Sequence, residues 1–183
     1  TRMLGLESSP SRIEYNGRLV SLGICPMGIN PDRFAVTPSV EKHIEMLNEH
    51  NKEMKIIVSV DKLDFCKGIV EKLEAMEYLL HNFPSLRGNV VYFVIVQDSG
   101  RTNALQYRML NEQINEMVGR VNGAFGSAEY CPIRYLKSTL EADQLTALYN
   151  VADVCIVSSL KEGINLQAME FIASQKNNCK GVL

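Results

Sequence analysis

The sequence lacks the patterns that would assign it to several common classes of protein. It contains no Walker-type phosphate loop, no G-x-G-x-x-G and no G-x-S-x-G. Kinase, dinucleotide-dehydrogenase and α/β-hydrolase interpretations therefore lose support. The longest apolar run, Val90–Val96, is far too short to span a bilayer, and neither a signal peptide nor an N-x-S/T acceptor is present. These absences predict a cytoplasmic protein with no membrane partner.

Disulfide and metal-binding patterns are also missing. The cysteines are odd in number and include no C-x-x-C pair (Cys25, Cys66, Cys131, Cys155 and Cys179). Three of the five lie in apolar surroundings, which predicts buried free thiols in a reducing compartment. The histidines, at positions 43, 50 and 81, have no metal-ligand spacing and are expected at the surface. No metal is predicted.

Charge and length limit the remaining choices. The 19 basic and 21 acidic residues give a formal net charge of -2, which argues against a general nucleic-acid-binding surface. A length of 183 residues with 46% hydrophobic content suits one globular domain, or one domain and a fragment of another. The first residue is not Met and Lys180–Leu183 resembles the start of a strand. We therefore expect a piece of a longer polypeptide, truncated at its C-terminus.

The N-terminal region differs in pattern from the rest. Two short β patterns flank Asn16-Gly17, which predicts a hairpin. The segment Pro26–Phe34 is dense in helix and strand breakers and predicts a crossing between structural units. A helix is expected over 38–51, with Ser39 as its N-cap. We assign residues 1–38 to the tail of one domain and the crossing, and residues 39–183 to a second domain.

Strand and helix patterns alternate through the second domain. Strands are expected over 54–60, 89–96, 132–136 and 154–157, and helices over 69–83, 103–121, 141–150 and 166–173. This alternation is typical of βαβ units. It predicts an α/β fold, a Rossmann-like doubly wound parallel sheet.

Three loops of that sheet carry candidate site residues. In a parallel sheet all strand-to-helix loops lie at one edge, where ligands bind. The first loop offers Lys62 and Lys67 before a helix N-terminus, and the second offers Arg101, all suited to phosphate groups. The third offers Glu162 and Glu170, acceptors for sugar hydroxyls, with the backbone N–H groups of 163–166 beside them. Together they predict a nucleotide-sugar site. Solvated surface charge is the alternative for each residue taken alone.

Four segments of the chain resemble a known family. They are PMGINPDRF at 26–34, VDKLDFCKGI at 60–69, VGRVNGAFG at 118–126 and LKEGINLQAMEF at 160–171. In order and spacing they are similar to the trehalose-6-phosphate synthases, retaining glucosyltransferases of the GT-B fold. The resemblance implies a two-domain enzyme that transfers glucose from UDP-glucose to glucose 6-phosphate, giving trehalose 6-phosphate and UDP, without metal or cofactor. This chain would hold mainly the C-terminal, nucleotide-sugar half and would be inactive alone.

The resemblance also implies a role for each candidate residue. Lys62 and Lys67 match the positions that hold the donor diphosphate, and Arg101 matches an arginine on the acceptor phosphate. Glu162 matches the acid that grips the donor glucose, beside the backbone of Gly163, Ile164, Asn165 and Leu166. Glu170 matches the acid that binds the ribose. Lys62, Lys67 and Glu162 would thus carry the catalytic step.

Three departures from the family pattern leave alternatives open. The family usually has arginine at position 62, aspartate at position 162 and Ile-Asp where Ile29-Asn30 stands. Replacing a bidentate guanidinium by an ammonium is not conservative. A regulatory homologue that binds sugar phosphates without catalysis therefore stays an alternative, as does a GT-B glycosyltransferase with another acceptor. A fused phosphatase domain, a homo-oligomer of the full-length protein and its regulators are left open.

Overall fold

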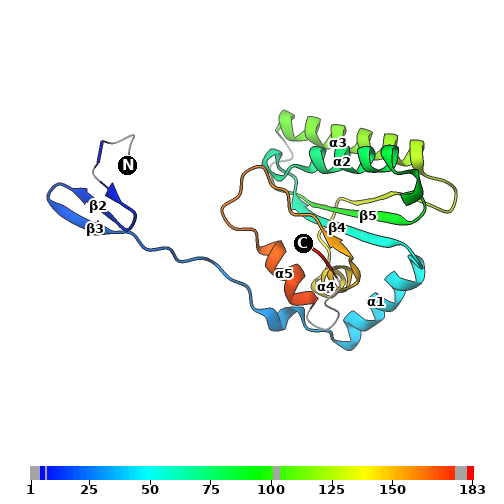
Figure 1. The fold of residues 1–183 in the computed structure, drawn as a ribbon, viewed down its shortest axis with the longest axis horizontal. Coiled ribbons are helices and arrows are strands. Elements are labelled where there is room, and N and C mark those ends of the chain that lie inside the picture. The colour runs from blue at the N-terminus through cyan, green and yellow to red at the C-terminus, as the bar shows by residue number, and fades with distance from the viewer. Residues whose placement is uncertain (1–4, 7, 101–103, 176–180) are drawn as a thin grey trace.

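The N-terminal part of the chain forms a small antiparallel sheet. The computed structural model describes residues 5–6, 8–100, 104–175 and 181–183. Strands β1 (Ser8–Ser9), β2 (Arg12–Tyr15) and β3 (Arg18–Ser21) pair in that order. Between β2 and β3, Asn16 (φ 50°) and Gly17 (φ 71°) are both left-handed, as a type I′ hairpin turn requires. The predicted hairpin is confirmed, and Figure 1 shows this sheet set apart from the remaining elements.

An extended segment leads from the hairpin to the 3₁₀ turn η2 (Pro31–Phe34) and then to helix α1 (Pro38–His50). Asn30 caps η2 through its side chain, which accepts from the Asp32 N–H at 3.1 Å. The predicted cap of α1 was wrong: Thr37, not Ser39, accepts from the Val40 N–H at 3.3 Å. Pro38 at the first helical position explains the shift by two residues, because its fixed φ and missing N–H suit N1.

The second part is a parallel sheet covered by helices on both faces (Figure 1). Its strands lie in the order β6-β5-β4-β7, all parallel. Their bounds are β4 Lys55–Lys62, β5 Val90–Gln97, β6 Ile133–Leu136 and β7 Val154–Cys155. The helices are α2 Ile69–Asn82, α3 Leu105–Phe125, α4 Ala142–Val151 and α5 Leu166–Ser174, with short 3₁₀ turns η3 Phe65–Lys67 and η4 Pro84–Leu86. The predicted Rossmann-like doubly wound fold is confirmed.

Two apolar layers hold the sheet between its helices. Residues 57, 92, 94 and 96 of β4 and β5 pack with α2 and α3, while residues 56, 58, 91, 93 and 95 pack with α4 and α5. Alternate residues of a strand face opposite sides, so a strand covered on both faces must be apolar throughout. β5 meets this demand with seven consecutive buried residues.

Strand β7 is shorter than predicted, covering two residues instead of four. Beyond Cys155 the chain leaves the ladder, although the Ile156 N–H still bonds to the Val58 carbonyl at 2.8 Å. On its other side Val154 forms a parallel bridge with Val182. The strand-like pattern predicted for 180–183 therefore pairs with the sheet at Val182.

The cysteine prediction was largely wrong. Of the four cysteines that the structure describes, all free, only Cys155 is buried, while Cys25, Cys66 and Cys131 are exposed. Local apolar neighbours in the sequence misled the interpretation, because exposure depends on which side of a loop faces the core. Burial raises the pKa of the Cys155 thiol to about 12. Cys179 lies outside the described residues.

Candidate functional site

The loop after β4 makes a sharp turn into α2. The Asp64 side chain accepts from the Cys66 N–H at 3.1 Å and so caps the 3₁₀ turn η3. Gly68 follows in the left-handed region (φ 63°) and starts α2. Lys67 is thus the last residue of η3, one position before a helix N-terminus, as the sequence predicted.

The loop between β7 and α5 packs directly against this turn. The Leu160 N–H donates to the carbonyl of Cys66 at 2.7 Å. A Cβ atom placed on Gly68 would lie 2.7 Å from the Ser158 carbonyl oxygen, closer than real contacts allow. Position 68 therefore needs glycine for two reasons, its left-handed backbone and this close approach.

Lys67 and Glu162 meet where the two loops touch. Their ammonium and carboxylate groups form an ion pair although they are 95 residues apart in the chain. The second carboxylate oxygen of Glu162 accepts from the Asn165 side-chain amide at 2.6 Å, and Asn165 in turn caps α5 by accepting from the Ala168 N–H. We call Lys67, Glu162 and Asn165 the charged rim. The predicted meeting of basic and acidic side chains from separate loops is confirmed for Lys67 and Glu162.

The side chains of the Lys67–Glu162 pair are mostly buried, which strengthens the attraction between their charges. The Lys67 and Glu162 side chains keep 15% and 20% of their surface exposed. Burial by itself would raise the pKa of Glu162, but the hydrogen bond and charge of Lys67, with smaller contributions from neighbouring polar groups that include Asn165, outweigh it and lower the pKa of that carboxyl. Glu162 is therefore an anion at neutral pH and an acceptor for hydroxyl groups.

Glu170 lies farther along α5, half-buried. Burial raises the pKa of Glu170, and the nearby charge of Arg33 in η2 partly opposes this shift. Arg33 is a residue whose contribution the sequence interpretation missed. Its place in the segment 26–34, which carried part of the family resemblance, was the available signal.

The other predicted site residues are more exposed or make fewer contacts than Lys67 and Glu162, or lie outside the described residues. Lys62 is exposed at the end of β4, beside Gln97 of β5, and makes no ion pair with the residues that the structure describes. Gly163 and Ile164 are exposed in the loop, and Leu166 begins α5 half-buried. Arg101 lies outside the described residues. The predicted roles of these residues stay predictions.

The described part of the chain carries neither a metal-binding cluster nor a membrane-spanning helix. No group of three or more His, Cys, Asp or Glu side chains is arranged to hold a metal ion there. Within the same residues, none of the helices combines the length and the apolar content that a membrane crossing needs.

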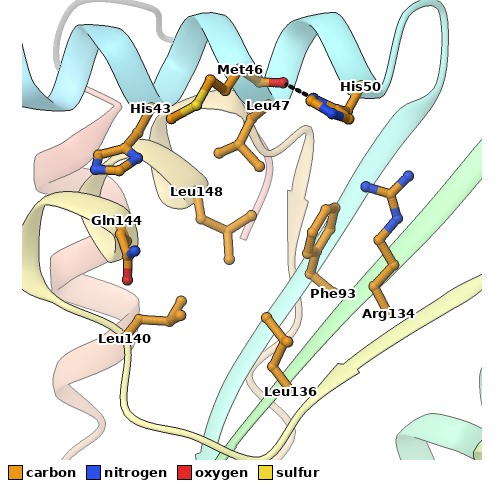
Figure 2. Close-up of a pocket in the computed structure, with 10 residues that line it drawn as sticks. All are labelled: His43, Met46, Leu47, His50, Phe93, Arg134, Leu136, Leu140, Gln144 and Leu148. Carbon is orange, nitrogen blue, oxygen red and sulfur yellow. Dashed lines mark hydrogen bonds between the residues drawn. The ribbon is translucent and has the colours of Figure 1, made fainter.

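A separate pocket of about 270 Å³ lies between α1, α4 and the edge of the sheet. Figure 2 shows its mainly apolar lining, which we call the apolar pocket: His43, Met46, Leu47, His50, Phe93, Arg134, Leu136, Leu140, Gln144 and Leu148. The Arg134 guanidinium lies 5.3 Å from the centre of the Phe93 ring, and the His50 ring donates to the Met46 carbonyl at 2.7 Å. None of the predicted site residues lines it. The pocket and the charged rim are therefore different features.

A parallel sheet covered on both faces, with charged loops gathered at the carboxyl ends of its strands, defines a Rossmann-like domain, a fold that commonly binds ligands at that edge. The chain belongs to glycosyltransferase family 20, whose model matches residues 1–183.

Individual relatives agree with this assignment. The chain is 42% identical over 185 residues to the alpha,alpha-trehalose-phosphate synthase [UDP-forming] 56 kDa subunit of Saccharomyces cerevisiae, covering 100% of this chain and 37% of the relative. A solved structure of the Escherichia coli trehalose-6-phosphate protein bound with UDP-2-fluoro glucose matches with a TM-score of 0.88 at 30% identity, covering 97% of this chain and 40% of that one.

A domain of a protein that is named a phosphatase has the same fold. The N-terminal domain of Candida albicans trehalose-6-phosphate phosphatase has a TM-score of 0.89 at 26% identity, covering 98% of this chain and 38% of that one. The chain thus spans less than half the length of each of these three proteins.

Proposed function

We propose that this chain forms the nucleotide-sugar half of a retaining glucosyltransferase, an alpha,alpha-trehalose-phosphate synthase that forms UDP. The observation that carries the proposal is the meeting of Lys67 and Glu162, brought together from two loops at the carboxyl edge of the sheet. Family membership and the name of the yeast relative support it. Forming trehalose phosphate with release of UDP requires a UDP-linked glucose as donor and a glucose phosphate as acceptor, here glucose 6-phosphate.

Each group at the site has a chemical role in this proposal. Lys67 and Lys62 neutralise the donor diphosphate, whose negative charge grows as the sugar bond breaks. Glu162, with the backbone of 163–166, accepts hydrogen bonds from the donor glucose, and the Glu170 carboxylate accepts from the ribose. Arg101 binds the acceptor phosphate. Because these groups position and neutralise, they need neither a metal ion nor a cofactor.

Donor binding exchanges one set of contacts for another. In the absence of donor, Lys67 and Glu162 neutralise each other. A diphosphate offers Lys67 a stronger anionic partner, and the glucose hydroxyls offer Glu162 new donors. The ion pair therefore keeps two charged side chains in place at low cost before the donor arrives.

Three broader statements belong to the same proposal. Residues 1–38 are the end of an acceptor-side domain with the interdomain crossing, and 39–183 are the nucleotide-sugar domain, as the separation of the hairpin sheet in Figure 1 supports. The protein is cytoplasmic, which agrees with the free thiols of the four described cysteines. The full-length protein forms a homo-oligomer, which light scattering would test.

The test is UDP release from UDP-glucose by the full-length protein. Release that depends on glucose 6-phosphate, with trehalose 6-phosphate as product, is the expected result. Glucose 6-phosphate should be replaced in parallel by glucose and by other sugar phosphates. Dependence on one of these would instead identify a GT-B glycosyltransferase with another acceptor.

A second function is favoured by two observations. The fold also matches a domain of a protein named a phosphatase, and positions 62 and 162 carry Lys and Glu where the family pattern has Arg and Asp. A regulatory homologue would bind UDP-glucose or glucose 6-phosphate in calorimetry without releasing UDP. A single variant that restores the bidentate guanidinium, Lys62→Arg, separates the two functions: gain of UDP release by that variant alone would identify a site degraded at position 62.

A further inference from the structure

A buried ion pair joins the two elements that flank Lys67 in the chain, β4 and α2. Asp61 Oδ2 and Lys72 Nζ are 2.7 Å apart, and their side chains keep only 4% and 2% of their surface exposed. Asp61 is the penultimate residue of β4, and Lys72 is in the first turn of α2. Lys72 occupies a position on the buried face of α2, among Ile69, Leu73 and Met76.

Such a pair is not explained by stability. Removing two charges from water costs more than their mutual attraction commonly returns, so apolar residues of similar size would serve the core as well or better. The neighbouring Ser59–Tyr92 hydrogen bond shows that polar groups are tolerated in this layer when they are paired. The reason for this charged pair must therefore lie in the residues around it.

Residues of the charged rim are among those whose charges act on Asp61. Burial raises the pKa of Asp61, and the charge of Lys72 opposes this shift most strongly. The charges of Lys67, which lowers that pKa, and Glu162, which raises it, also act on the carboxyl. Four groups therefore alternate in sign from the core to the surface: Lys72, Asp61, Lys67 and Glu162. Lys67 has an acidic neighbour on each side, one at the rim and one in the core.

We propose that Lys72 is a positioning residue for diphosphate binding, which acts by occupying the Asp61 carboxylate and so leaving Lys67 at the rim. Without Lys72, ionisation of the buried Asp61 carboxyl depends on another cation, and Lys67 is near enough to act on it. The Lys67 ammonium then turns from Glu162 toward Asp61 and binds a diphosphate less well. This inference rests on the proposed role of Lys67.

The experiment measures UDP affinity by calorimetry on the full-length protein, in mildly alkaline buffer, because burial raises the pKa of Asp61. Lys72→Met is expected to weaken UDP binding about tenfold, comparable to losing a charge-assisted contact. In the Lys67→Ala background the same change is expected to have no further effect. A role confined to folding would lower affinity equally in both backgrounds, and that result would overturn the inference.

The double variant Asp61→Asn/Lys72→Met removes the competing carboxylate together with its partner. It leaves no unpaired buried charge, and it carries the test even if Lys72→Met does not fold. Its UDP affinity is expected to lie within about threefold of wild type. A loss of tenfold or more in this variant would overturn the proposal.

Matched controls isolate the buried pair from α2 as a whole. Glu77 of α2 pairs with Arg120 of α3 at the same 2.7 Å, but at the exposed surface. Glu77→Gln should leave UDP affinity unchanged, and its circular dichroism should match that of each folded variant. If wild type does not bind UDP, or Lys67→Ala does not weaken binding, the proposed function fails. If both behave as proposed and Lys72→Met binds UDP normally, only the inference about Lys72 fails.

Discussion

The charged rim and the apolar pocket both lie beside the parallel sheet, but they are formed by different kinds of side chain. The rim consists of side chains that hold one another by charge and hydrogen bonds, across two loops. The pocket is lined mainly by apolar side chains of α1, α4, β5 and β6. A hollow therefore does not by itself mark the functional site of this protein. We propose the functional site instead where charged side chains converge at the strand ends, and the predictions below test that division.

The largest effect is expected in the apolar pocket, and on stability alone. Leu148 is 3% exposed and belongs to the apolar layer beneath α4. Leu148→Ala should lower the free energy of unfolding by about 2–4 kcal/mol, from lost burial and the cavity that remains. Urea unfolding measures this loss. UDP affinity of the folded variant should stay within about twofold of wild type, and a larger decrease would show that the two regions are coupled.

The next effect is expected at the rim, and on binding. Lys67→Ala removes the cation proposed for the diphosphate and should weaken UDP binding about 30-fold, near 2 kcal/mol, by calorimetry. Lys161→Ala is the matched control, because Lys161 is an exposed lysine of the loop between β7 and α5. Equal affinities for the two variants would refute the diphosphate assignment and remove the distinction between rim and surface.

Disturbing the contact between the β4–α2 loop and the β7–α5 loop should reduce UDP affinity less than Lys67→Ala does. Gly68→Ala places a methyl group 2.7 Å from the Ser158 carbonyl oxygen, at a left-handed backbone position. We expect a loss of about 1–2 kcal/mol in stability and a several-fold loss in UDP affinity as the loops separate. Gly119→Ala on α3, where a Cβ meets nothing within 4 Å, should instead stabilise slightly. Normal UDP binding by Gly68→Ala would mean that the loops need not touch.

The smallest effect concerns the ribose. Glu170→Gln should lower affinity for UDP by about 1 kcal/mol, a few-fold, and abolish the preference of wild type for UDP over 2′-deoxy-UDP. Calorimetry with both nucleotides measures the preference. A variant that keeps it would place the ribose elsewhere.

The same residue makes UDP binding depend on pH. Burial raises the pKa of Glu170 above 4.5, so the carboxylate is protonated at a higher pH than a surface glutamate is. Protonation removes a hydroxyl acceptor, and UDP affinity should therefore fall as the pH decreases through that raised pKa. Glu170→Gln should lack this part of the profile. Glu162, with its lowered pKa, stays ionised over the same range and contributes nothing to it.

Much of this site could be predicted from the sequence, and the failures have clear reasons. Lys67 and Glu162 follow strands that a parallel sheet must align, so their meeting needed only the fold class. Asp61 and Lys72 were missed, although an aspartate ending a buried strand and a lysine on the apolar face of a helix were visible signals. Their pairing could not be predicted from the sequence, because the sequence does not determine which strand α2 packs Lys72 against. The Thr37 cap was missed because Thr37 and Ser39, on either side of Pro38, are both suitable N-cap residues and the proline decides between them.

The order of apolar runs, breakers and charged turns was enough to determine the alternating strands and helices, because backbone periodicity and glycine or proline conformation act over a few residues. Only the tertiary structure decided which charges neutralise one another: Lys67 with Glu162 at the rim and Lys72 with Asp61 in the core. Electrostatic energy depends on distance and burial, and both are set when segments far apart in the chain pack together.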